Sequence, residues 1–423
     1  MIQVPRSSHV VALSSAVAFA TQVAFALLML QWFSPQDVGE FSVISQIGFF
    51  WMTLALAQTP LSMLANHHLP AHVAAQHAWR TSLLRAMGLL PVAALAVWLS
   101  HLSLSPALLW ALLLALCQMG WMLAQSWTLR TGRAWQQAAV RVLPPLTAMC
   151  TAGLSVALSS LWLADTVGTS TTTANAWGAT FLLGSALLGY AVGAVWLVPA
   201  LRHDAQATAA QTASDEPAAA DQSDPRSAGL RMAHTLVDAL LATAIVVVWQ
   251  RLYGAQETGY LTALLRVLGF VPAVVHMAWA QVALAHGRGQ DNHHATPWWL
   301  GLGAFACVMG LGAIAAVALY MGWLDERWSG MWPYIAPLVL WQGSACLSAA
   351  FAHRPFQTQS ARSYSWLCMG VAALQAVALL APLALAEPLD AMAHLAAFTT
   401  VSGLGLLGLT VWMARLQSLT NDQ

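Results

Sequence analysis

The sequence has very few charged residues, and none of them is lysine. Only 8% of its 423 residues are charged, whereas 59% are hydrophobic. Soluble domains carry roughly 25% charged residues, so this chain lacks the side chains needed to cover a surface exposed to water. All 16 basic residues are arginine, and no long basic run occurs that would favour nucleic-acid binding. The composition therefore indicates a membrane protein.

Several catalytic signatures are also missing. The sequence contains no G-x-x-x-x-G-K-[ST] motif, no nucleophile elbow and no H-E-x-x-H motif. Its five cysteines lie singly in apolar stretches, which is typical of small buried hydrophobic residues and not of disulfides or metal sites. The expected loops are too short to hold a catalytic domain. We therefore expect a protein that is not an enzyme and that uses no cofactor and no metal.

Long apolar segments recur along the whole chain. A helix needs about 20 apolar residues to cross a bilayer, because each residue rises 1.5 Å across roughly 30 Å of hydrocarbon. Helices of this kind are predicted over residues 9–31, 40–63, 82–101, 106–129, 138–163, 176–201, 230–250, 259–286, 297–322, 331–352, 364–386 and 391–414. These runs are too long for barrel strands. The predicted fold class is an all-α integral membrane protein with about 12 transmembrane helices.

A polar segment over residues 202–229 separates the predicted helices into two sets of six. It is rich in Ala, Asp, Gln, Ser and Pro and has almost no large apolar residue. Such a composition is typical of a flexible linker. We therefore predict an N-terminal six-helix bundle over residues 1–201, a cytoplasmic linker over 202–229 and a C-terminal six-helix bundle over 230–423.

The arginines predict the orientation of the chain in the membrane. With the N-terminus inside, only Arg251 and Arg327 fall outside, and Arg266 lies within a helix. The remaining arginines fall on the cytoplasmic side: Arg6, Arg80, Arg85, Arg130, Arg133, Arg141, Arg202, Arg226, Arg231, Arg288, Arg354, Arg362 and Arg415. The inverted orientation violates the positive-inside rule. Both termini are therefore expected in the cytoplasm.

The two halves resemble each other at a nearly constant offset. The segment FSPQDVGEF, which starts at Phe33, aligns with YGAQETGYL, which starts 220 residues later at Tyr253. The tetrapeptide RAWQ at Arg133 aligns with RPFQ at Arg354, an offset of 221 that Arg141 and Arg362 share. Six helices per repeat return the chain to its starting side, so the halves are expected to be parallel repeats. Repeats of this kind place a substrate path between the halves.

The same segments resemble a known family. The stretch LYGAQETGYLTALLRVLGFVPAVV is similar to the corresponding segment of bacterial polysaccharide-export flippases of the O-antigen type. The stretch LRTGRAWQQAAVRVL, residues 129–143, resembles the segment that follows the fourth helix in that family. The family belongs to the multidrug/oligosaccharidyl-lipid/polysaccharide (MOP) superfamily, which also includes the lipid II flippase and drug–cation antiporters.

The resemblance implies a function that the composition alone does not. It implies that the protein moves an oligosaccharide linked to undecaprenyl pyrophosphate from the inner to the outer leaflet of the bacterial inner membrane. Transport would use a cation gradient and alternating access. The implied partners are the lipid-linked oligosaccharide, membrane lipid, and the polymerase and chain-length regulator proteins of polysaccharide synthesis. A drug–cation antiporter and a membrane-embedded polysaccharide polymerase or ligase are the alternatives.

Two ionisable residues are predicted deep within helices, where a charge costs at least about 2.5–3.5 kcal/mol. Asp238 lies ~18 Å and Arg266 ~10 Å from the outer helix ends, at 1.5 Å per residue. Arg266 is a candidate to bind the substrate's pyrophosphate, together with its repeat counterpart Gln46. Asp238 is a candidate for ion coupling, and His234, one helical turn earlier, for tuning its protonation. The alternative is a structural ion pair, or an Arg266 that reaches the outer interface.

Other polar residues have two interpretations each. Asp37, Glu40 and Glu257 are expected to cap helix N-termini, and a role for Glu40 in cation entry is the alternative. Four arginines either set the orientation of the chain by the positive-inside rule or form a basic vestibule for the substrate's pyrophosphate: Arg133, Arg141, Arg354 and Arg362. The histidines at 67, 68, 72, 77, 286, 293 and 294 are expected in cytoplasmic loops, and their spacing matches no zinc site.

Prolines and glycines predict how the helices bend and pack. Pro144, Pro145 and Pro272 are hinge candidates because proline removes a backbone hydrogen bond inside a helix. The pair Gly189 and Gly193 has the spacing that allows two helices to approach closely.

Overall fold

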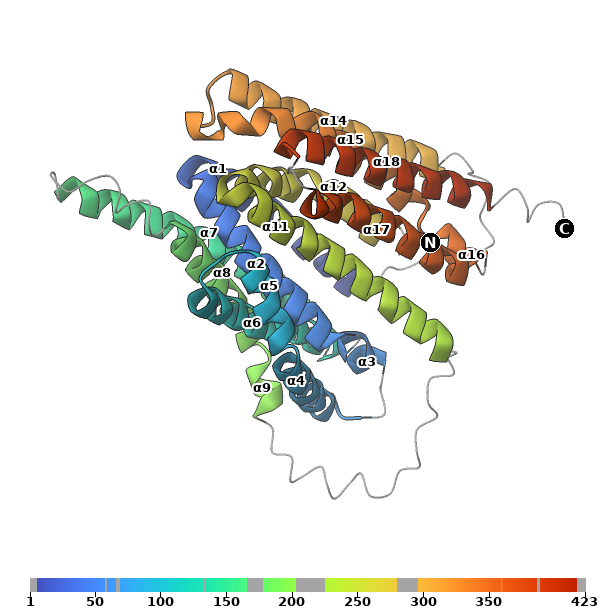
Figure 1. The fold of residues 1–423 in the computed structure, drawn as a ribbon. Helices are drawn as coiled ribbons and strands as arrows, with labels where there is room; N and C mark the ends of the chain where they lie inside the picture. Colours follow the sequence, from blue (N-terminus) through green and yellow to red (C-terminus); the bar gives the residue numbers. More distant parts are fainter. Residues whose placement is uncertain are drawn as a thin grey trace. The chain divides into compact units, whose positions relative to one another are not determined.

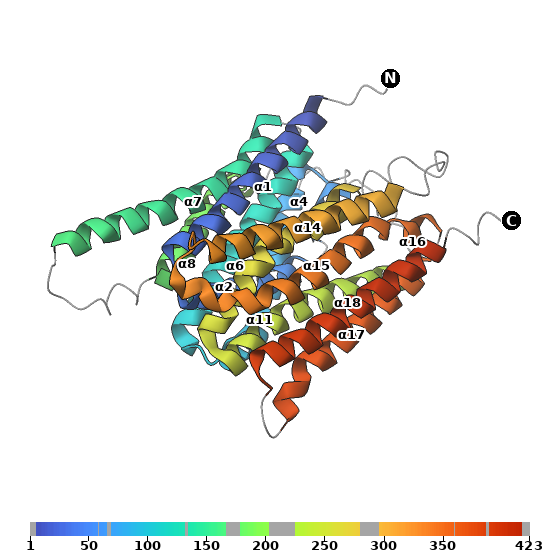
Figure 2. The ribbon, with the colours of Figure 1, turned by 90° about the horizontal axis from the view of Figure 1, so that it is seen from above.

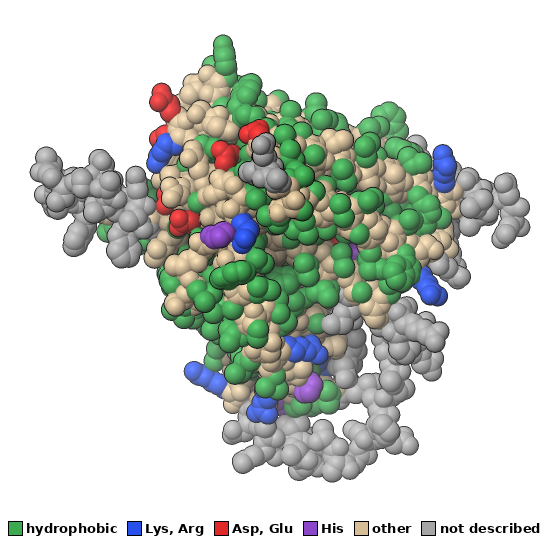
Figure 3. All heavy atoms as spheres, in the orientation of Figure 1, with side chains coloured by type: hydrophobic (Ala, Val, Ile, Leu, Met, Phe, Trp, Pro, Cys, Tyr) green, Lys and Arg blue, Asp and Glu red, His purple; other side chains and the backbone are tan. Residues whose placement is uncertain are grey.

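The computed structural model describes residues 6–57, 59–65, 69–131, 134–165, 178–202, 225–279, 296–358, 360–385 and 389–416 (Figure 1). Within these ranges the regular structure consists of helices, and no strand occurs. Hydrophobic side chains predominate over the face drawn in Figure 3, and charged side chains are few there. The structure confirms the predicted all-α membrane protein.

Residue contacts divide the chain into two compact units. The first unit takes in Met1–Phe33 and Glu40–Asp224, and the second takes in Ser34–Gly39 and Pro225–Gln423. The Ser34–Gly39 turn therefore packs with the second unit, although the helix that it starts continues into the first. Most of the predicted linker, residues 203–224, lies outside the described ranges. The next helix begins at Pro225, five residues before the predicted position.

In the first unit four helices pack one against the next, in the order α6, α8, α7 and α1. Its helices are α1 (Arg6–Trp32), α2 (Pro35–Leu56), α3 (Thr59–Ala65), α4 (Ala71–Gly88), α5 (Leu90–Leu99), α6 (Leu104–Thr131), α7 (Ala134–Asp165), α8 (Gly178–Val195) and α9 (Val198–Leu201). Helix α8 packs against both α6 and α7, and α7 also packs against α1, as Figure 2 shows.

The second unit has α14, α15 and α18 side by side, with α17 in contact with both α18 and α11 (Figure 2). Its elements are α11 (Pro225–Leu268), α12 (Phe270–Val274), the π-helical turn η3 (Val275–Trp279), α14 (Thr296–Tyr320), the 3₁₀ turn η4 (Glu326–Met331), α15 (Trp332–Phe351), α16 (Arg354–Gln357), α17 (Ala361–Ala384) and α18 (Ala391–Arg415).

Nine stretches among the described residues are long and apolar enough to cross a membrane, and α4 with α5 makes a tenth, bent by 48°. One stretch, Ala233–Val274, is 42 residues long, about twice what one crossing needs. The apolar Val17–Trp32 part of α1 is shorter than the rest. With α1 included and two crossings in the long stretch, the described helices agree with the predicted number of about 12.

A single glycine divides α11 into two membrane-spanning helices. Gly254 has φ 82° and ψ −178°, a backbone conformation that is open essentially to glycine alone. The sequence predicts a loop between residues 250 and 259, but the structure keeps helical geometry on both sides of Gly254. The predicted loop was therefore wrong, because one glycine makes the bend without a longer connection.

The two repeated turns, at residues 34–39 and 254–259, touch each other through their backbones within the second unit. A Cβ atom on Gly39 would lie 1.9 Å from the carbonyl oxygen of Ala255, and one on Gly259 would lie 1.9 Å from that of Pro35. Pro35 and Ala255 are repeat counterparts, as are the two glycines, so the contacts are reciprocal. Glycine is needed at both positions because any side chain would overlap the facing backbone.

The predicted close packing at Gly189 and Gly193 is confirmed in the first unit. A Cβ atom on Gly189 would lie 2.6 Å from the carbonyl oxygen of Pro144, and one on Gly193 would lie 2.3 Å from the Trp121 ring. Pro144 has no N–H, so the carbonyl of Val140 has no helical donor four residues later. The Trp121 indole N–H donates to that carbonyl at 2.7 Å, which compensates for the proline.

The predicted histidine loop between the second and third crossings is partly wrong. His72 and His77 lie in α4, where apolar residues on the opposite helix face pack inward. The other five loop histidines lie outside the described residues. The polar character of this segment reflects the exposed face of a helix and not a loop.

Candidate functional site

The clearest candidate site lies on the first half of α11. His234 Nε2 and Asp238 Oδ2 are 3.2 Å apart, one helical turn from each other. The Asp238 side chain is 60% exposed and that of His234 is 22% exposed. The predicted association of these two residues is therefore confirmed, because residues four apart lie on the same helix face.

Residues of two other elements surround this pair. The Tyr364 ring on α17 meets the His234 ring edge to face at 6.0 Å. Cys368 lies one turn after Tyr364, and the two side chains are hydrogen-bonded to each other. His276, in the π-helical turn η3, is exposed and lies within electrostatic reach of Asp238. Three segments that are distant in the sequence thus bring ionisable groups together in the second unit.

The exposure of Asp238 is unusual for its position. It lies within the apolar 42-residue stretch Ala233–Val274, where a carboxylate that faced lipid would be costly. Such groups almost always face a water-filled path or a partner. The partner here is the imidazole of His234, whose side chain is 22% exposed.

The other predicted deep polar residues occupy less exposed positions. Arg266 is half-buried near the end of α11, and Gln46 and Glu40 are half-buried in α2. The charges that act on Asp238 are those of His234 and His276. The ion partner of Asp238 is therefore His234, one turn away on its own helix.

The four candidate vestibule arginines differ in their surroundings. Arg354 is buried: its Nη1 donates to the carbonyl of Ala414 at 3.1 Å, and its guanidinium lies 4.5 Å from the centre of the Phe351 ring. It thereby ties α16 to the end of α18. Arg362 is exposed in the first turn of α17, and Arg141 is half-buried in α7. Arg133 lies outside the described residues.

A second polar cluster lies on both sides of Gly254 in α11. The hydroxyl of Tyr334 donates to Glu257 Oε2 at 2.6 Å, and the Trp249 indole N–H lies 3.3 Å from that hydroxyl. The Tyr253 hydroxyl lies 2.9 Å from His394 Nδ1. Trp249, Tyr334 and His394 are fully buried. The interpretation of Glu257 as a helix cap was wrong, because its carboxyl group is bonded across to α15.

This group of residues, the Glu257 cluster, was missed from the sequence. Glu257 and Tyr334 are 77 residues apart, and Tyr253 and His394 are 141 apart. Neither pair has a local spacing that would signal a contact. A usable signal was the presence of polar aromatic residues and a histidine inside otherwise apolar helices, because such groups need hydrogen-bond partners when buried.

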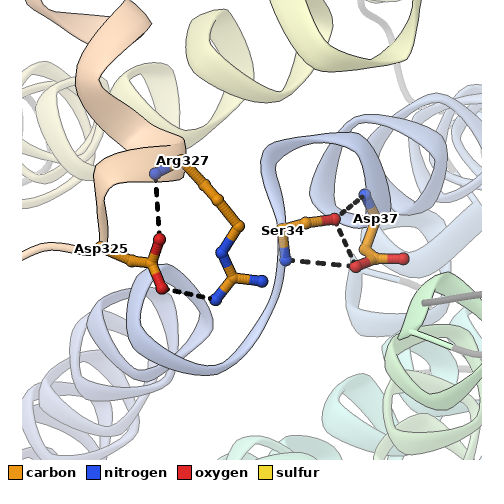
Figure 4. A network of polar contacts seen from close by, with 4 residues as sticks. All are labelled: Ser34, Asp37, Asp325 and Arg327. Atoms are coloured by element: carbon orange, nitrogen blue, oxygen red, sulfur yellow. Dashed lines mark hydrogen bonds and ion pairs between the residues drawn. The ribbon is translucent and has the colours of Figure 1, made fainter. Parts of the chain in front are cut away.

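The predicted cap at Asp37 is confirmed. Its Oδ2 accepts from the Ser34 hydroxyl at 2.5 Å and from the Ser34 N–H at 3.1 Å, while the Asp37 N–H donates to the Ser34 hydroxyl oxygen. This is a reciprocal capping box at the start of α2. Figure 4 shows the cap beside Arg327, whose guanidinium donates to Asp325 at 2.9 Å. The hydrogen bonds from Arg327 lower the pKa of Asp325.

The described residues contain no group of three His, Cys, Asp or Glu side chains that is arranged to hold a metal ion. The His234–Asp238 pair is thus a site of two interacting ionisable groups. Its chemistry is the binding and release of a proton, or the attraction of a cation to an exposed carboxylate.

Comparisons with known proteins give little further information. No protein-family model and no curated protein match the sequence. A solved structure described as the inward-facing conformation of a multidrug resistance MATE family transporter of the MOP superfamily is similar over 100% of this chain and 97% of that chain. The identity is 11% and the TM-score is 0.44. A similarity at this level does not establish a shared function.

Proposed function

We propose that this protein is a flippase of the bacterial inner membrane, with both termini in the cytoplasm. Its substrate is an oligosaccharide linked to undecaprenyl pyrophosphate, as used for O-antigen and lipopolysaccharide synthesis, and a cation gradient drives its transport. The observation that carries the proposal is the exposed Asp238 with its His234 partner on a membrane-spanning helix. A charged group in that position has little structural use and suits a transport path.

Arg266 is the proposed anchor for the substrate's pyrophosphate. A guanidinium binds phosphate oxygens through two parallel charge-assisted hydrogen bonds. It lies in the segment that resembles the polysaccharide-export family, and Gln46 is its counterpart in the first half. Arg141, Arg362 and Arg133 complete the proposed basic entrance. Arg354 has a weaker claim because its guanidinium already bonds the Ala414 carbonyl.

The proposal is tested by replacing Arg266 with alanine and, separately, with lysine in a strain that lacks the protein. We expect the alanine variant to lose surface polysaccharide and the lysine variant to recover part of it, because lysine keeps the positive charge. Arg327→Ala is the matched control, since Arg327 is paired with Asp325 at an exposed turn. Membrane levels of each variant are measured in parallel. Normal polysaccharide in Arg266→Ala would remove Arg266 as the anchor.

A drug–cation antiporter is the second candidate, and the exposed carboxylate of Asp238 is the observation that favours it. A carboxylate attracts a cationic substrate, whereas Arg266 repels one. The same strains distinguish the two functions. Drug susceptibility that depends on Asp238, together with polysaccharide that is independent of Arg266, would favour the antiporter.

A further inference from the structure

The first unit has arginines but almost no carboxyl groups to balance them. Residues 41–164 contain no aspartate or glutamate and five arginines, namely Arg80, Arg85, Arg130, Arg133 and Arg141. In Figure 3, basic side chains gather where Figure 1 places α4 and α9, and no acidic side chain is visible in that part of the view. The positive charge there needs a counter-charge from outside the chain.

Two polar side chains hold this end of the first unit in shape. Arg130 at the end of α6 donates to the carbonyl of Leu69, which ties down the connection between α3 and α4. The Gln76 amide in α4 donates to the carbonyl of Leu201 at 3.4 Å and so joins α4 to the end of α9. Arg202 follows directly and is exposed, which places a further guanidinium beside α4.

On α4, one exposed face changes from polar to apolar along the helix. His77 and Arg80 are exposed near its start, and Leu84 and Met87 follow with exposed fractions of 71% and 68%. Steps of three or four residues keep all four side chains on one face. At 1.5 Å per residue, Leu84 lies ~6 Å and Met87 ~10 Å beyond Arg80. Because α4 and α5 together make a membrane crossing, Leu84 and Met87 meet acyl chains and Arg80 lies at the level of the headgroups.

Arg85 adds a second guanidinium from deeper in the same helix. Its Nη1 donates to Thr59 Oγ1 at 3.2 Å, which holds the side chain between α3 and α4. A long arginine side chain reaches the headgroup level while its methylene groups stay among the acyl chains. Within the described part of the chain, neither Arg80 nor Arg85 forms an ion pair. Both charges are therefore open to a ligand that arrives from the membrane.

The arrangement of these side chains matches a phospholipid. A guanidinium binds phosphate oxygens through two parallel charge-assisted hydrogen bonds. A phospholipid brings its phosphate to Arg80 and Arg85 and lays its acyl chains over Leu84 and Met87. A soluble anion would leave those two apolar side chains uncovered. Basic pockets between membrane helices bind anionic lipid headgroups, and the cytoplasmic leaflet, where the proposed orientation places α4, is rich in such lipids.

We infer that α3, α4 and the end of α9 form a binding site for the headgroup of an anionic phospholipid, which Arg80 and Arg85 hold with Arg202 beside them. The ligand is a resident lipid of the membrane and not the transported one. The site goes beyond the proposed flippase function and does not depend on it. A zwitterionic lipid fits less well, because its ammonium group is repelled by the same arginines.

The site is tested by photochemical labelling of the full-length protein in vesicles of phosphatidylethanolamine and phosphatidylglycerol. A trace of phosphatidylglycerol with a photoreactive acyl chain is activated by light, and the labelled peptides are identified by mass spectrometry. We expect label on the peptide that contains Leu84 and Met87. Excess phosphatidylglycerol should displace this label, whereas excess phosphatidylcholine should not. Equal displacement by phosphatidylcholine would overturn the inference, because the face would then take any phospholipid.

Arg80→Gln assigns the label to the site. Arg80 is exposed and takes part in none of the ion pairs between described residues, so the change breaks no salt bridge. A basic side chain near an anionic membrane surface contributes about 1 kcal/mol, so label on α4 should fall roughly fivefold relative to label elsewhere in the same molecule. Arg327→Gln is the matched control, since Arg327 is exposed but paired with Asp325. Unchanged labelling of α4 in Arg80→Gln would overturn the inference.

Two further competitors separate a resident lipid from other anions. Inorganic phosphate supplies the anion without acyl chains, and undecaprenyl phosphate supplies the carrier lipid of the proposed substrate. We expect inorganic phosphate to leave the label in place and undecaprenyl phosphate to displace it no better than phosphatidylglycerol does. Displacement by inorganic phosphate would make this a site for free anions, and stronger displacement by undecaprenyl phosphate would make it a substrate entrance. Either result would overturn the inference.

Discussion

Helix α11 carries two carboxyl groups in opposite surroundings, one on each side of Gly254. Before Gly254, Asp238 is exposed and lies 3.2 Å from His234. After it, Glu257 accepts a hydrogen bond from Tyr334, in a cluster of buried aromatic rings. Both carboxyl groups lie within the same apolar stretch. The different surroundings of Asp238 and Glu257 show that a carboxyl group inside a membrane helix does not by itself indicate a functional site.

What separates the two sites is burial, because each carboxyl group has a bonded side-chain partner. The Glu257 cluster joins α11, α15 and α18 through Tyr334, Tyr253 and His394, and Tyr334 and His394 are fully buried. A bonded and enclosed network of this kind fixes the packing of helices. The Asp238 side chain is 60% exposed beside His234. We therefore assign a structural role to the Glu257 cluster and keep the ion-coupling role as the proposal for Asp238.

The largest effect on stability is expected where the two repeated turns, at residues 34–39 and 254–259, cross. Gly39→Ala and Gly259→Ala each force a methyl group against a facing carbonyl, and overpacking of this kind costs about 1–3 kcal/mol or more. Gly303→Ala and Gly310→Ala are controls, because a Cβ atom there meets nothing within 4 Å. Thermal unfolding in detergent should show lower melting temperatures for the first two alone. Equal melting of all four variants would mean that the crossing is not tight.

A smaller loss is expected from Tyr334→Phe. The change removes the hydroxyl that bonds Glu257, and an intramolecular hydrogen bond contributes about 0.5–1.5 kcal/mol to stability. Tyr320→Phe is the control, since the Tyr320 side chain is 80% exposed. The two melting temperatures in detergent are compared at the same pH. If Tyr334→Phe had the same melting temperature as the wild type, the Glu257 cluster would not have the structural role assigned to it.

The smallest effect is expected at the exposed Asp325–Arg327 pair. Its hydrogen bonds lower the pKa of Asp325 in the folded protein, so the pair stabilises the fold above the ordinary carboxyl range. That contribution is lost as the pH falls through the lowered pKa, below about 4. Melting of Asp325→Asn should therefore differ slightly from the wild type at neutral pH and converge with it in acid. A difference in melting temperature that grew as the pH fell would contradict the lowered pKa of Asp325.

Local features were predictable from the sequence because their partners are four or fewer residues apart. The capping box of Ser34 and Asp37 and the pair of His234 and Asp238 follow from helix geometry alone. In both cases the sequence distance determines the spatial one. The spacing of Gly189 and Gly193 predicts a close approach of another helix, but it does not identify Pro144 and Trp121 as the residues that they meet.

Contacts between distant helices were not predictable in the same way. Nothing in the sequence places Tyr334 beside Glu257, or Arg354 against the carbonyl of Ala414. The repeat identifies Gly39 and Gly259 as counterparts, but their reciprocal contact depends on how the two turns cross. The sequence therefore yields the elements and the candidate residues, whereas tertiary packing decides which candidates are already bonded.

The most direct test of this account compares transport by Asp238→Asn and Glu257→Gln in the same proteoliposomes. The rate of translocation of a fluorescent lipid-linked oligosaccharide under an imposed pH gradient is divided by the amount of folded protein. The account predicts loss of transport in Asp238→Asn and a nearly normal rate per folded molecule in Glu257→Gln. Normal transport in Asp238→Asn, with loss in a fully folded Glu257→Gln, would contradict it.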